Sequence, residues 1–190
     1  MATQSRRFIP RLQPLDERAL PSVSYDLQGT FLFVTGDAGA NSITITDNGT
    51  ETGITVDGVG ELGDVATFVA TTPITHIFVQ GLEGDDTVVY NLTGPLGFNR
   101  LIDGDLGRGA DSFTANLTNQ SIGAGVNLDI SAAGGMGGDT MVLNAQNVST
   151  DTGAILNVGF SGEAGRDTIV FDYTAGIELG QVILTKDQKH

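Results

Sequence analysis

The residues with the clearest chemical potential are one asparagine and four aspartates that each follow a glycine-rich turn: Asn41, Asp86, Asp111, Asp139 and Asp167, at intervals of 45, 25, 28 and 28 residues. Glycine lets a turn adopt positive φ and direct carbonyl oxygens into a shared space, and a carboxylate adds an anionic oxygen. Calcium prefers six to eight such oxygens at about 2.3–2.6 Å. The pattern therefore predicts a row of calcium sites, each shared by two successive turns.

The candidate metal ligands are the four acidic turns. Their residues are Gly81, Gly84 and Asp86; Gly107, Gly109 and Asp111; Gly134, Gly135, Gly137 and Asp139; and Gly162, Gly165 and Asp167. We expect the strongest site between Asp111 and Asp139, then Asp139 with Asp167, then Asp86 with Asp111. The neutral Asn41 turn is expected to be weak or empty. Further ligands are expected from Glu83, Asp85, Asp103, Asp105 and Glu163. The simpler alternative is a tight corner in which each aspartate bonds its own backbone.

The residues around each turn indicate strands. The second and fourth residues after the acidic position are mostly apolar and the first is Ser or Thr, an alternation typical of a half-buried strand. A second apolar column precedes the acidic position by nine residues: Leu32, Ile77, Ile102, Ile130 and Val158. A polar column follows it by five residues: Asn91, Asn116, Asn144 and Asp172. These amides either form a hydrogen-bonded ladder or simply end each strand.

The repeat predicts an all-β fold, a parallel β-solenoid of about 25–28 residues per coil. Because no single coil buries its own apolar face, at least three coils must stack. Residues 23–190 form this domain. Within it, residues 42–75 are either an antiparallel hairpin around Asn48 and Gly49 or a coil without a Gly–Asp turn.

The turn ending at Asp139 resembles the RTX, or haemolysin-type, calcium-binding repeat G-G-x-G-x-D-x-U-x, because Gly134, Gly135, Gly137, Asp139 and Met141 match every fixed position. The other turns lack one of the glycines, and the first has no acid. The resemblance implies a parallel β-roll in which turn carbonyls and the aspartate hold calcium. Two copies never stand back to back here, so a single row of sites along one edge is expected.

Residues 1–22 have a different composition, with four of the nine basic side chains. The stretch from Arg11 to Ser22, RLQPLDERALPS, resembles the N-terminal motif of the planctomycete extracellular-protein family. That resemblance implies an export-associated segment and an extracellular or cell-envelope location.

Composition narrows the function classes. A net charge of −14 opposes binding to nucleic acid and attracts cations. No apolar run is long enough for a membrane-spanning helix. With no Cys, and with neither His76 nor His190 in a known catalytic pattern, no enzyme is expected.

We therefore expect a calcium-binding structural or adhesive protein. The alternative is a carbohydrate-active or sugar-binding β-helix that recognises cell-surface or matrix polysaccharide, which carboxylates and an arginine on a flat strand face would favour. Self-association through exposed edge strands is a further expectation.

Overall fold

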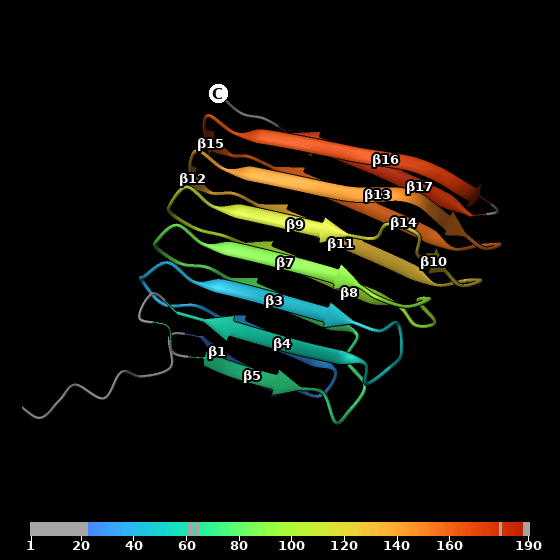
Figure 1. Ribbon diagram of the computed structural model, residues 1–190, viewed down its shortest axis with the longest axis horizontal. Coiled ribbons are helices and arrows are strands. Elements are labelled where there is room, and N and C mark those ends of the chain that lie inside the picture. Colours follow the sequence, from blue (N-terminus) through green and yellow to red (C-terminus); the bar gives the residue numbers. More distant parts are fainter. Residues whose placement is uncertain (1–22, 61–62, 64, 179, 188–190) are drawn as a thin grey trace, which may run out of the picture.

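The computed structural model describes residues 23–60, 63, 65–178 and 180–187, so the expectations for residues 1–22 lie outside the described part. The described residues form strands and turns with no helix, and hence no helix that could span a membrane. Coils stack in parallel, as Figure 1 shows, with registers offset by 25 and 28 residues. The predicted parallel β-solenoid is thus confirmed.

Two sheets form the long walls of the solenoid. The first sheet has the order β1 (Ser24–Gln28), β2 (Phe31–Thr35), β6 (His76–Gln80), β8 (Arg100–Asp105), β11 (Asn127–Ala133), β14 (Ile155–Ser161), β17 (Gln181–Asp187). The second has the order β10 (Ser121–Ile122), β13 (Thr140–Thr150), β9 (Ser112–Asn116), β7 (Thr87–Leu92), β3 (Ser42–Asp47), β4 (Ile54–Val59), β5 (Val65–Val69), and β16 (Thr168–Glu178) also pairs with β13. A third, two-stranded sheet joins β12 (Met136–Gly137) to β15 (Ala164–Gly165).

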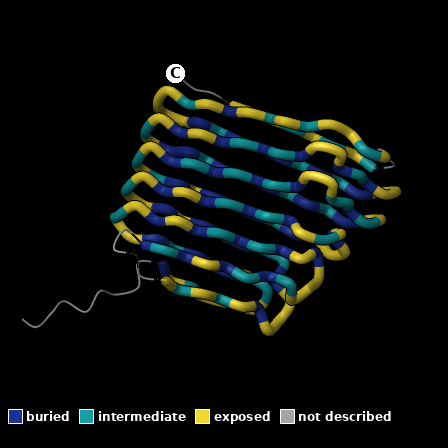
Figure 2. The backbone as a smooth tube through the Cα atoms, viewed as in Figure 1, coloured by how far each residue is buried: buried dark blue, intermediate teal, exposed yellow. Residues whose placement is uncertain are grey.

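The core lies between the two long sheets. The apolar column of the first sheet, from Leu32 to Val158, is buried, and so is the facing column of the second sheet: Ile43, Val88, Phe113, Met141 and Ile169. Figure 2 shows buried positions alternating with partly exposed ones along each wall. Because strand side chains alternate between faces, one set of residues closes the core while the other faces outward.

The N-terminal end of the stack is antiparallel. Strand β3 pairs with β7 in parallel but with β4 antiparallel, and β4 pairs antiparallel with β5. The Asn48 amide donates to the Gly53 carbonyl at 2.9 Å and closes the turn. Residues 42–75 are therefore the hairpin alternative, which explains the longer first interval. Strand β1 covers the edge of β2 in the same antiparallel manner.

A buried ion pair holds this hairpin to the parallel stack. Arg100 Nε lies 2.7 Å from Asp47 Oδ2, and both side chains are fully buried. The Tyr90 hydroxyl donates to the same carboxylate oxygen at 3.0 Å, and burial, with the Asp47 charge, raises the Tyr90 pKa well above its ordinary value. Removing one partner would leave an uncompensated buried charge, so both side chains are needed where the hairpin packs on the stack.

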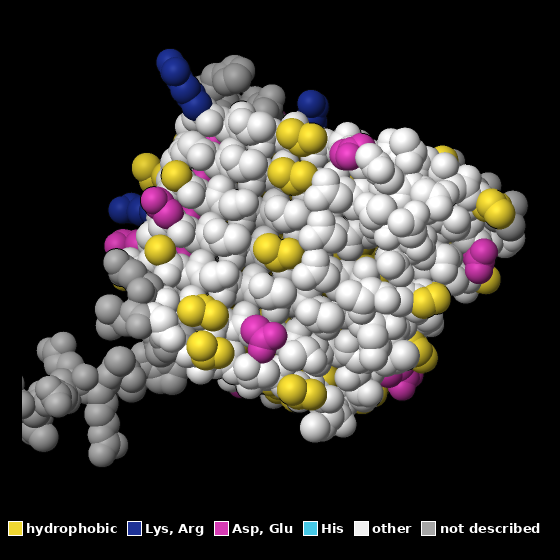
Figure 3. Space-filling model, in the orientation of Figure 1, with side chains coloured by type: hydrophobic (Ala, Val, Ile, Leu, Met, Phe, Trp, Pro, Cys, Tyr) yellow, Lys and Arg dark blue, Asp and Glu magenta, His cyan; other side chains and the backbone are white. Residues whose placement is uncertain are grey.

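The outer face of the second sheet carries the asparagine ladder. Asn116 Nδ2 donates to Asn91 Oδ1 at 2.7 Å, and Asn144 Nδ2 donates to Asn116 Oδ1 at 2.8 Å. The ladder is thus confirmed for these three asparagines. Figure 3 shows only scattered hydrophobic and charged side chains on this face. The ladder links three successive coils on the outside of the wall.

Candidate functional site

The four acidic turns lie along one edge of the solenoid, where each coil passes from the first sheet to the second (Figure 1). Strands β12 and β15 pair in parallel at this edge, and isolated bridges join Glu83 to Arg108 and Arg108 to Met136. The predicted metal ligands therefore stand one above another in a single column and are not scattered over several faces. We call this column of Asn41, Asp86, Asp111, Asp139 and Asp167 the carboxylate file.

Close contact between successive turns explains the glycines. Gly137 has φ of 155°, and a Cβ at this position would overlap the carbonyl oxygen of Gly109 in the preceding coil. Gly109 stands in the same relation to Gly84. Because any side chain would separate the turns, glycine is needed here for coil-to-coil packing, whether or not a cation is bound.

Within the file, each carboxylate bonds the backbone of the preceding coil. Asp86 Oδ1 accepts from the Asn41 amide at 2.7 Å, Asp111 Oδ1 from the Asp86 amide at 2.7 Å, and Asp139 Oδ1 from the Asp111 amide at 2.9 Å. Asp167 Oδ1 continues the series with the Asp139 amide at 3.0 Å. These bonds of the aspartates thus run between coils and not within one corner.

Asn41 occupies the first position of the file, where no acidic turn precedes it among the described residues to offer an amide. Its Nδ2 donates to the Gly39 carbonyl at 2.7 Å and to Asp37 Oδ1 at 3.0 Å, and its Oδ1 accepts from the Asp37 amide at 2.8 Å. An aspartate could not make the two donations. The neutral residue therefore fits the start of the file, which the sequence interpretation treated only as a weak metal site.

The second oxygen of three of the carboxylates is the unusual feature of the file. Asp86, Asp111 and Asp139 are only 1–2% exposed, and their Oδ2 atoms have no hydrogen-bond partner among the described residues. A Cβ built on Gly81 would overlap both Asp86 Oδ2 and the Leu106 carbonyl oxygen, so these two oxygens approach the same point. At this point a proton, a cation or a water molecule would supply the positive partner that the Asp86 Oδ2 atom lacks.

The pKa values follow from this environment. Burial raises the pKa of Asp86 from its ordinary value of 3.8 to about 6, an effect opposed by the Asn41 amide and reinforced by the Asp111 charge. Burial likewise raises the pKa of Asp111 to about 6, with a further contribution from Asp139. The pKa of Asp139 is raised by burial and by Asp167 and Glu163. The file therefore favours any positive species that reaches it.

The donor set fits calcium in part. A buried carboxylate oxygen beside a backbone carbonyl, as at Asp86 and Leu106, is the oxygen chemistry that calcium binds. Several turn carbonyls already accept coil-to-coil hydrogen bonds, however: Leu82 from Arg108 at 2.8 Å and Gly107 from Met136 at 2.8 Å. The described residues hold no group of three or more His, Cys, Asp or Glu arranged around a metal position.

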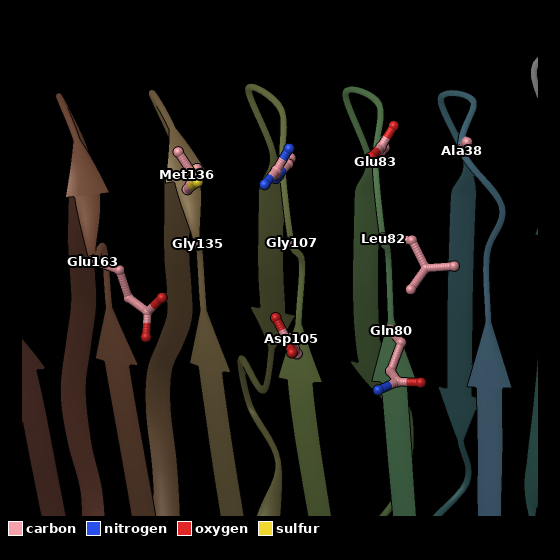
Figure 4. A pocket seen from close by; sticks show the side chains of 10 residues that line it. Ala38, Gln80, Leu82, Glu83, Asp105, Gly107, Gly135, Met136 and Glu163 are labelled. Carbon is pink, nitrogen blue, oxygen red and sulfur yellow. The ribbon is translucent and has the colours of Figure 1, made fainter.

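The acids expected to supplement the file lie outside it. Glu83, Asp105 and Glu163 are exposed and line an open groove of about 790 Å³ on the outer side of the corners. Figure 4 shows their side chains among those of Gln80, Leu82 and Met136. Asp85 accepts from the Ala110 amide at 2.8 Å, and Asp103 accepts from the Ser131 hydroxyl at 2.6 Å. These acids add negative potential near the file but face solvent.

Comparison of the chain with protein-family models, with curated proteins and with solved structures finds no match. The interpretation of the carboxylate file therefore rests on its own geometry. The resemblance to the RTX repeat stays a prediction about its turns.

Proposed function

We propose that this chain is a structural β-solenoid of the cell exterior whose carboxylate file is neutralised and cross-linked by calcium. The observation that supports the proposal is the column of buried Oδ2 atoms at Asp86, Asp111 and Asp139, which have no partner among the described residues. At neutral pH a buried carboxylate with a donor on only one oxygen is costly, and a divalent cation between coils would turn the repulsion between successive carboxylates into attraction. Calcium would draw on these oxygens, on neighbouring carbonyls and on water.

The expected strength of such sites suits a stabilising role. Extracellular calcium modules have dissociation constants of about 10⁻⁴–10⁻³ M. At about 1 mM calcium, each site would add roughly 0.4–1.4 kcal/mol to the free energy of unfolding. A typical domain is stable by about 5–15 kcal/mol, so a few sites would adjust rigidity without deciding whether the chain folds. Millimolar free calcium is an extracellular condition, in keeping with the location that the N-terminal motif implies.

A stack of coils with two flat walls suits a spacer or an adhesive scaffold, because each coil contacts only its neighbours and the outer side chains are free to vary. The outer faces carry ladders of amide, hydroxyl and carboxylate groups, such as Asn91–Asn116–Asn144 and Asp103–Ser131. We therefore propose that adhesion uses the outer faces of the two long sheets and that calcium binds at the edge that the acidic turns form.

Calorimetric titration of the full chain with calcium tests the proposal. We expect the parent to bind calcium, Asp139→Asn to bind fewer ions, and Asp105→Asn to bind as the parent does, because Asp105 is exposed on the outer side of the corner. Equal calcium binding by Asp139→Asn and the parent would show that the file is not the site.

A further inference from the structure

The outer face of the first sheet carries a partly exposed aromatic cluster near its N-terminal end. Phe31 stacks on His76 with ring centroids 4.4 Å apart, and Phe33 stacks on Phe78 at 5.1 Å. The interplanar angles are 16° and 15°, and Phe31 and Phe78 lie within 5° of parallel. Phe31 is 39% exposed. The four rings are thus nearly parallel to one another and in contact with solvent. We call them the aromatic wall.

A trough of small polar side chains begins beside this wall. The strand register places Asp103 next to Phe78, then Ser131, Gly159 and Thr185 in the same row of successive coils. One hollow of about 320 Å³ is lined by Phe33, Phe78, Gln80, Asp103 and Asp105. A second, of about 300 Å³, contains Asp103, Ser131, Gly159 and Thr185 in its lining. The two hollows share Asp103 and follow one line across the strands.

Gly159 keeps the trough open. It does not have positive φ, and a Cβ built on it would meet no atom within 4 Å. Neither backbone conformation nor packing therefore requires a glycine at this strand position. Its effect on the surface is to leave the trough floor bare between Ser131 and Thr185.

We propose that this face binds a linear, uncharged polysaccharide along the solenoid axis. The apolar face of a sugar ring stacks on an aromatic wall, and its hydroxyl groups donate to carboxylate and amide oxygens such as those of Asp103, Asp105 and Gln80. Strands stand about 4.8 Å apart, so the polar groups of successive coils repeat on the scale of one sugar unit.

Charge decides between classes of polysaccharide. The outward positions of the described first-sheet strands include Asp26, Asp103, Asp105 and Asp129, and the row of the trough itself holds no Lys or Arg among the described residues. A uronate or sulfated chain would meet like charge and no cation there, whereas a neutral chain would meet acceptors for its hydroxyl groups. The proposal does not depend on calcium in the carboxylate file.

Native-gel affinity electrophoresis of the full chain tests the proposal, with mixed-linkage β-glucan and hydroxyethylcellulose as neutral probes, alginate as the anionic probe and chitosan as the cationic one. We expect retardation by a neutral probe. Phe78→Ala and Gly159→Thr should each weaken it on the order of tenfold, the first by removing the wall and the second by filling the trough. Phe98→Ala is the control, because Phe98 is an exposed phenylalanine, at 41%, that lies outside the ring cluster.

Thermal melts of the same variants separate binding from folding. Gly159→Thr should melt at or above the parent temperature and still lose binding. Three results would each overturn the proposal. The first is migration that neither neutral probe changes, the second is retardation by alginate or chitosan alone, and the third is equal retardation of the parent and Gly159→Thr.

Discussion

The amide of Asp86 donates to Asp111 Oδ1 at 2.7 Å, and this bond joins two acidic residues of successive coils. Each aspartate in the middle of the file is both a donor, through its backbone, and an acceptor, through its carboxylate. The bond satisfies only Oδ1, and Oδ2 of the same carboxylate is buried with no partner in the part of the chain that the structure describes. The Oδ1 atoms therefore link successive coils, and the Oδ2 atoms place negative charge in a buried position.

The first position of the file requires a side-chain amide at residue 41. Asn41→Asp would lose the donations from Nδ2 to Gly39 and Asp37 and add a charge beside Asp86. We expect a loss of about 1–3 kcal/mol in the free energy of unfolding, measured by urea denaturation at neutral pH. Asn99→Asp is the control, because Asn99 uses its side-chain oxygen to accept a hydrogen bond from the Asn127 amide at 2.9 Å, and a carboxylate keeps that acceptor. Equal stability of the two variants would contradict the described role of Asn41.

Two glycines should respond to alanine with opposite signs. At Gly137 a Cβ would overlap the Gly109 carbonyl, so Gly137→Ala should destabilise the chain by about 1–3 kcal/mol or more. At Gly159 a Cβ meets open space, so Gly159→Ala should stabilise it by about 0.4–1 kcal/mol through the unfolded state. Urea midpoints of the two variants measure the difference. A tolerated alanine at residue 137 would show that the turns do not need their close contact.

The raised carboxyl pKa values predict an inverted pH dependence in the presence of a chelator. Between the ordinary pKa of 3.8 and the folded value of about 6, Asp86 and Asp111 bind protons in the folded state and not in the unfolded one. Stability from these groups is therefore present at low pH and is lost as the pH rises through 6. The melting temperature should rise between about pH 7.5 and about pH 5.

The double variant Asp86→Asn, Asp111→Asn removes both titrating groups and should show a flatter profile over the same range. A melting temperature of the parent that falls on acidification through pH 6 would mean that the buried carboxylates are stabilised by their charge.

Much of the fold could be predicted because the repeat reports it directly. The acidic column, the two apolar columns and the asparagine ladder keep a fixed spacing from one another within each coil, so the register of β7, β9 and β13 follows from the alignment. The direction in which the neighbouring acidic side chains point could not be predicted from the repeat. Asp105 and Glu163 stand near the file in sequence but face the outer groove, because alternation along a strand and the turn geometry decide the side.

The buried ion pair could not be predicted from the repeat. Asp47 ends β3 and Arg100 begins β8, on opposite sheets, so the packing of the two sheets brings them together and no column of the repeat pairs them. The aromatic wall, by contrast, follows from the repeat, because the column that aligns Leu32 with Ile77 also aligns Phe31 with His76 and Phe33 with Phe78. The sequence prediction used only the inward positions of that column.

The central claim is that calcium neutralises the buried carboxylates of the file. Thermal unfolding tests it most directly, with the parent and Asp86→Asn each measured in a chelator and in millimolar calcium at neutral pH. The substituted side chain would keep the acceptor for the Asn41 amide and place an amide donor beside the Leu106 carbonyl. In chelator the variant should therefore melt at or above the parent temperature, and calcium should raise the melting temperature of the parent more than that of the variant. A parent that melts at the same temperature in both conditions, or a variant that melts lower in chelator, would contradict the account.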